Sequence, residues 1–115
     1  MGRLTTHILD TVNGCPAAGI AIRLFSIGEQ REQIACAASN ADGRTEKSLL
    51  EGETMVTGTY ELEFDIGDYF KSRNAAVDDP AFLDTVVIRF SARGNEHYHV
   101  PLLCSPWAYS TYRGS

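Results

Sequence analysis

Apolar and polar residues alternate along much of the chain, in short runs that end at turn-forming residues. The clearest run spans 60–66, where apolar side chains occupy every second position and acidic side chains occupy the positions between them, Glu61, Glu63 and Asp65. A period of two places one face of a strand against a core and leaves the other face in water. The run therefore predicts a β-strand that is buried on one side.

Similar β-prone runs lie on both sides of this strand and are separated by Gly, Asn, Asp or Pro. They cover residues 4–12, 18–27, 33–39, 85–91, 97–104 and 107–112. The stretch 67–74 breaks the alternation, and we expect Asp68 to cap a short helix there, with Phe70 facing the core. Seven or eight short strands with one short helix predict an all-β protein, an antiparallel β-sandwich.

Length and charge narrow the classes of function. A chain of 115 residues has room for one domain with its own core, so we expect residues 1–115 to form a single domain. The formal net charge of −5 argues against a nucleic-acid partner and against a surface held to anionic lipid. The longest apolar run, 17–22, is too short to span a membrane.

The cysteines indicate the cellular compartment of the protein. The chain has three of them, Cys15, Cys36 and Cys104. An odd number cannot be fully paired within the chain, and no two have the Cys-x-x-Cys spacing of metal sites. We therefore expect free thiols that serve packing, in a reducing compartment. Together with an N-terminus that lacks the apolar segment of a secretion signal, this predicts a cytoplasmic location.

The candidate chemistry centres on the histidines. His97 and His99 share one face of a predicted strand, and Tyr98 with its apolar neighbours takes the other face, toward the core. Two exposed histidines on a strand are compatible with a solvated surface as well as with a site. A metal is not expected, because no third ligand lies nearby in the sequence. His7 and Arg44, taken singly, are also ordinary exposed positions in a strand and after a turn.

Four segments together resemble transthyretin-like proteins. They are Leu4–Asp10 followed by Gly14–Ala17, then Asp42-Gly43-Arg44, then His97–Pro106, and the terminal Tyr112–Ser115. The last segment matches the tetrapeptide that marks the enzyme branch of the family, and the resemblance covers the whole chain. The hormone-binding branch lacks both this tetrapeptide and the histidines that match here.

This resemblance implies a prealbumin-type sandwich that assembles as a homotetramer of two dimers. It also implies an activity, because the enzyme branch hydrolyses 5-hydroxyisourate, the unstable product of urate oxidation. Ring opening gives 2-oxo-4-hydroxy-4-carboxy-5-ureidoimidazoline on the way to allantoin and needs no cofactor. The alternative is a carrier that binds a small ligand between the two dimers without chemistry.

Residue by residue, the family's catalytic positions fall on His7, Arg44, His99, Tyr112 and Ser115, and its substrate contacts on His7, Arg44, Tyr112, Arg113, Gly114 and Ser115. A histidine, with an ordinary pKa of about 6.5, can activate water near pH 7. Arg44 can stabilise an oxyanion and favour a neutral imidazole beside it. We expect His99 to be the base and His7 to lie close to it and orient water or substrate. His97 is either a residue of the site's rim or a solvated side chain.

Overall fold

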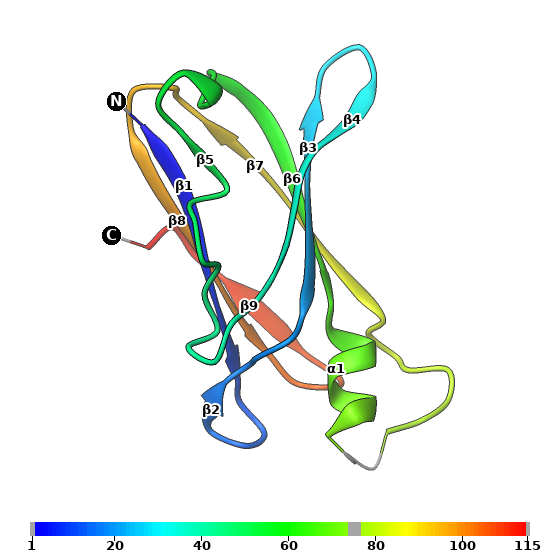
Figure 1. The fold of residues 1–115 in the computed structure, drawn as a ribbon. Helices are drawn as coiled ribbons and strands as arrows, with labels where there is room; N and C mark the ends of the chain where they lie inside the picture. The colour runs from blue at the N-terminus through cyan, green and yellow to red at the C-terminus, as the bar shows by residue number, and fades with distance from the viewer. Residues whose placement is uncertain (1, 74–76, 115) are drawn as a thin grey trace.

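The computed structural model describes residues 2–73 and 77–114, which form two β-sheets packed face to face (Figure 1). The first sheet has the strand order β2–β1–β8–β9, with β5 paired to β1, and the second has the order β4–β3–β6–β7. The first sheet's strands are β1 (Arg3–Asp10), β2 (Cys15–Pro16), β5 (Leu50–Glu51), β8 (His97–Cys104) and β9 (Tyr109–Thr111). Those of the second are β3 (Ala21–Ile27), β4 (Arg31–Ala38), β6 (Gly58–Asp65) and β7 (Thr85–Ala92). A 3₁₀ turn, η1 (Gly52–Thr54), and a helix, α1 (Ile66–Ser72), complete the described elements.

The alternating run is β6, as predicted. Leu62 and Phe64 are fully buried in the core between the sheets. The acidic residues of the same strand lie on the outer face, where they pair with arginines of the neighbouring strands β3, β4 and β7. This ladder of ion pairs covers the outer face of the second sheet with charge. The histidines of β1 and β8 belong to the other sheet.

The β-sandwich prediction is confirmed, with one difference in strand direction. β1 and β8 run parallel, whereas every other strand pair among the described residues is antiparallel. Antiparallel neighbours can be joined by a tight hairpin, but parallel neighbours need a long connection. Here that connection passes through the whole second sheet, so no local turn fixes the relative direction of the two strands.

The helix lies where the alternation breaks, but its start differs from the prediction. α1 continues directly from β6, and its N-cap residue is Asp65. Asp68 lies in the first turn, so the prediction that Asp68 caps the helix was wrong, while Phe70 is buried as expected. In the described part of the chain, no helix is both long and apolar enough to cross a membrane.

The three cysteines are free, but they do not share one environment. Cys104 is fully buried, and burial raises the pKa of its thiol to about 12, so it behaves as a packing residue. Cys15 is half-buried. Cys36 is exposed, which corrects the packing prediction for this residue. The reason is that β4 is an edge strand whose side chains lie largely outside the sandwich.

Candidate active site

The pairing of β1 with β8 brings the two central histidines together. In the register of these strands Thr5 lies opposite His99, and His7 lies opposite Pro101. Residues two apart on a strand share a face, so Thr5, His7 and His99 all lie on the outer face of the first sheet. The ring centroids of His7 and His99 are 6.4 Å apart. The expectation that these histidines lie close together is confirmed.

Arg44 reaches the histidines because the loop that carries it pairs with β1. Arg44 forms a β-bridge with His7, and the Ile8 amide donates to the carbonyl of Gly43 at 2.8 Å. Gly43 has a φ of 74°, and a side chain there would overlap the Ile8 carbonyl. Glycine is therefore required for this close approach of the two backbones. The Asp42-Gly43-Arg44 segment thus places Arg44 opposite His7.

His99 has the most altered electrostatic environment of the candidate residues. Burial lowers its pKa, and the positive charges of Arg44 and His7 lower it further. Since the ordinary pKa is about 6.5, His99 is neutral at pH 7 and can accept a proton. Its Nδ1 lies 2.8 Å from Thr5 Oγ1. When Nδ1–H donates to this hydroxyl, Nε2 is left as the basic atom.

Sequence reasoning missed Thr5. The available signal was its position two residues before His7 on the same strand, which places both on one face. Threonine is common in exposed strand positions, so that signal could not separate a partner of His99 from ordinary β-propensity.

The C-terminal segment packs against His99 at one point. The Gly114 amide donates to the His99 carbonyl at 2.7 Å. The antiparallel pairing with β8, which stops where β9 ends at Thr111, thus continues at Gly114. The interruption lies opposite Pro101, which has no N–H to donate. The Pro101 carbonyl instead accepts a hydrogen bond from the Thr111 hydroxyl at 2.7 Å. Gly114 therefore lies beside the imidazole of His99.

The other C-terminal residues are placed differently. Arg113 Nη2 donates to Glu96 Oε1 at 3.1 Å and to the His97 carbonyl at 3.2 Å, and its guanidinium lies over the Tyr98 ring. Its charge is therefore engaged away from the His7–His99 pair. Tyr112 is 62% exposed, and Ser115 lies outside the described residues.

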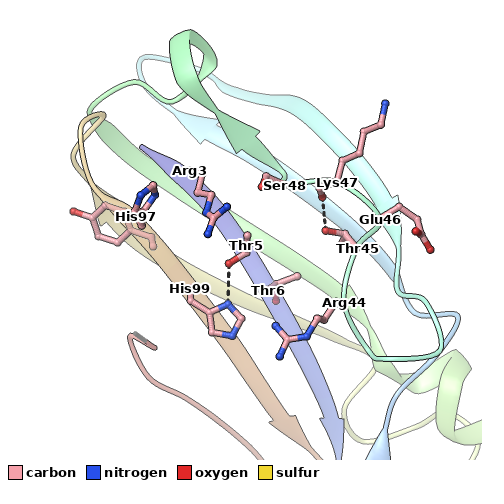
Figure 2. Close-up of a pocket in the computed structure, with 11 residues that line it drawn as sticks. Arg3, Thr5, Thr6, Arg44, Thr45, Glu46, Lys47, Ser48, His97 and His99 are labelled. Carbon is pink, nitrogen blue, oxygen red and sulfur yellow. Dashed lines mark hydrogen bonds between the residues drawn. The ribbon is translucent and has the colours of Figure 1, made fainter. Parts of the chain in front are cut away.

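An open pocket of about 530 Å³ lies over these strands. Arg3, Thr5, Arg44, His97 and His99 line it, with the loop 45–48 along one side. In Figure 2 the guanidinium groups of Arg3 and Arg44 point toward the Thr5–His99 pair. His97 is exposed and belongs to the lining of the same pocket. In residues 2–73 and 77–114, no cluster of His, Cys, Asp and Glu side chains is arranged to hold a metal ion.

Replacing Gly114 with alanine is expected to disturb the site directly. The new Cβ would lie 2.6 Å from His99 Cδ2, so either the imidazole or the C-terminal segment must move. We expect kcat/KM to fall about tenfold or more, because displacements near 1 Å are costly in a positioned site. Gly58→Ala is the matched control, since nothing lies within 4 Å of its Cβ position. Equal activity of the two variants, with equal melting temperatures, would contradict this prediction.

The fold and the site together define a class of protein. Two packed sheets in this strand order make a prealbumin-type sandwich, and two histidines and an arginine lie together on the outer face of one sheet. The model of the HIUase/Transthyretin family matches residues 4–114, and the chain belongs to this family.

Individual relatives agree with this assignment. The chain is 55% identical to a 5-hydroxyisourate hydrolase of Ralstonia nicotianae, over all of both chains. It is 53% identical to a 5-hydroxyisourate hydrolase of Pseudomonas aeruginosa, over all of this chain and 93% of that one. Sea bream transthyretin, solved in complex with thyroxine, is 28% identical with a TM-score of 0.87, over 97% of this chain and 94% of that one.

Proposed function

We propose that this chain, acting as one domain, hydrolyses 5-hydroxyisourate to 2-oxo-4-hydroxy-4-carboxy-5-ureidoimidazoline, a step in the degradation of urate to allantoin. The observation that carries the proposal is the His7–His99 pair beside Arg44 on the outer sheet face, where His99 and Arg44 line the pocket. Identity above 50% to proteins named 5-hydroxyisourate hydrolase, over the full chain, supports the same substrate.

In the proposed reaction water is the only co-reactant. Neutral His99 takes a proton from the water as its oxygen attacks a ring carbonyl, which gives a tetrahedral oxyanion and an imidazolium. When the oxyanion collapses, the ring C–N bond breaks and the imidazolium returns its proton to the leaving nitrogen. The products are a carboxylate on the former carbonyl carbon and one released proton. His7, 6.4 Å from His99 between ring centroids, orients the water or the substrate.

Arg44 has two functions in this proposal. Its charge lowers the pKa of His99, which keeps the base neutral, and its guanidinium can bind the oxyanion that forms at the attacked carbonyl. Both functions need a fixed positive charge near His99, and the β-bridge between Arg44 and His7 fixes the position of Arg44.

The C-terminal residues complete the proposed site. Gly114 packs against His99, and the family resemblance assigns Tyr112 and Ser115 to substrate contact. We assign Arg113 a different function, because its guanidinium is held by Glu96 and the His97 carbonyl. In this interpretation Arg113 anchors the segment so that Gly114 stays beside His99.

A carrier without chemistry is the alternative, and the pocket does not favour it. Its lining is dominated by charged and hydroxyl side chains, including Arg3, Arg44 and Thr5. Pockets for aromatic or drug-sized ligands are lined mainly by apolar side chains.

The ultraviolet decay of freshly made 5-hydroxyisourate tests the function. We expect micromolar protein to accelerate the decay many-fold over the buffer rate. Decay at the buffer rate, in a sample whose circular dichroism shows a folded β-protein, would favour the carrier.

We propose in addition that the protein is a homotetramer of two dimers, with the sites in clefts between them. An interface is supported at the edge strand β9, because three aromatic side chains on and beside it are exposed, Trp107, Tyr109 and Tyr112. A face that is open in one chain becomes a closed cleft when a second dimer covers it. Light scattering is expected to give four times the chain mass of 12.6 kDa. A fully active monomer would contradict the proposal.

A cytoplasmic location is also proposed, and the free thiols support it. None of the three cysteines is in a disulfide, and Cys36 is exposed, as suits a reducing compartment. Fractionation of source cells checks it, and recovery of the protein outside the cytoplasm would contradict it.

A further inference from the structure

The positive charges of this acidic chain are unevenly paired. The sequence has ten Lys and Arg residues, and six of them lie within 4 Å of a carboxylate: Arg23, Arg31, Lys71, Arg89, Arg93 and Arg113. A seventh, Arg73, lies over the Tyr69 ring. Within residues 2–73 and 77–114, the remaining three, Arg3, Arg44 and Lys47, have no such carboxylate partner.

All three of these cations line the same pocket over β1 and β8. One carboxylate, Glu46, also lines it, and Glu46 Oε1 accepts a hydrogen bond from Asn40 Nδ2 at 3.3 Å. In a chain with a net charge of −5, this concentration of positive charge favours a ligand that presents negatively polarised oxygens.

Two of these three cations extend toward the Thr5–His99 pair and the third does not. In Figure 2 the Arg3 and Arg44 guanidinium groups both extend toward the Thr5–His99 pair, whereas the Lys47 side chain extends away from it. Arg3 precedes Thr5 by two residues on β1 and so shares its face. Arg44 is bridged to His7, farther along the same strand. Arg3 and Arg44 therefore reach the pocket from two different points along β1, and the Thr5–His99 pair lines the same pocket.

We propose that Arg3 forms a second oxygen-binding subsite, which holds the end of a cyclic ureide that is remote from the attacked carbonyl. The inference rests on the proposed function, in which Arg44 binds the oxygen that becomes the oxyanion. A ureide ring carries carbonyl oxygens on several sides, and a planar guanidinium can donate two parallel N–H bonds to such oxygens. Because the remote carbonyls do not change charge during the attack, Arg3 binds substrate and transition state equally. A residue of this kind sets KM and leaves kcat nearly unchanged.

Steady-state kinetics of Arg3→Gln tests the subsite. We expect KM for 5-hydroxyisourate to rise about tenfold to a hundredfold, the size of one charge-assisted hydrogen bond, with kcat within about threefold of the wild type. Arg3→Lys keeps the charge and loses the planar fork, so it is expected to recover part of the KM. Lys47→Gln is the matched control, because it removes the same charge from a side chain of the same pocket that points away from Thr5 and His99.

Two outcomes would overturn the proposal. Equal rises in KM for Arg3→Gln and Lys47→Gln, abolished at high salt, would indicate general electrostatic attraction instead of a subsite. A wild-type KM in Arg3→Gln would show that Arg3 does not touch the substrate.

Calorimetric titration with urate, which keeps the ring carbonyls, gives a reading independent of turnover. The affinity is expected to fall in Arg3→Gln and to hold in Lys47→Gln, and equal affinity in all three proteins would contradict the subsite. If the wild type did not accelerate decay, the proposed function would fail on that result alone, while urate binding would still test Arg3.

Discussion

The His99→Ala variant is expected to lose about 10²- to 10⁴-fold in kcat/KM for 5-hydroxyisourate, the contribution of a positioned general base. His99 is the imidazole whose pKa is lowered by burial and by Arg44, and whose Nδ1 is held by Thr5. It projects from the outer face of β8, so its removal leaves the core between the sheets intact. The decay assay gives the loss, and a thermal melt confirms that the variant is folded.

The two other histidines serve as comparisons for this prediction. His7→Ala is expected to be severely impaired as well, because His7 lies 6.4 Å from His99 between ring centroids and is bridged to Arg44. His97→Ala is expected to lose little activity, because His97 is an exposed residue of the pocket's lining. A His97 variant as inactive as His99→Ala would mean that the wrong histidine has been assigned as the base.

Replacing Arg44 with glutamine is expected to have the second largest effect. It removes the group that we propose binds the developing oxyanion, and we expect a loss of about 10²- to 10³-fold in kcat. Arg44→Glu reverses the charge and is expected to be lower still. Arg89→Gln, on the outer face of the other sheet, is the control and should keep wild-type activity.

Arg44→Gln also predicts a change in pH dependence. In the wild type the pKa of His99 is lowered, so the base stays neutral, and kcat/KM is retained, to a pH below the ordinary value of about 6.5. Without the Arg44 charge this pKa rises, and the acid limb of kcat/KM is expected to move to higher pH. An acid limb at the same pH in both proteins would show that the Arg44 charge does not lower the pKa of the base.

The sequence alone predicted the parts of the structure that rest on local periodicity. The alternation in β6 identified its buried face, and the same reasoning placed Tyr98 in the core and His99 outside it. The turn at Gly43 was also visible as a motif. These features depend on residues close together in the chain, so a pattern of period two or a turn residue is enough to show them.

Features that depend on distant pairing were not predictable in this way. The parallel direction of β1 and β8, and hence the Thr5–His99 contact, follows from the path of the chain through the second sheet. The helix begins at Ile66 because β6 ends there, and Asp68 carried a capping signal without being the cap. Exposed residues such as Arg3 and Arg113 have no periodic signature, so their partners became visible with the tertiary structure.

The pairing of β1 with β8 also bears on the order of folding. Thr5 and His99 are 94 residues apart, and closing a loop of that size costs roughly 4 kcal/mol of chain entropy. The strands of the second sheet lie together in the chain, between Ala21 and Ala92, so that sheet can form before β8 docks beside β1. The imidazole pair comes together once β8 has docked beside β1. Recovery of activity after denaturation therefore reports the closing step of folding rather than the formation of the first hairpins.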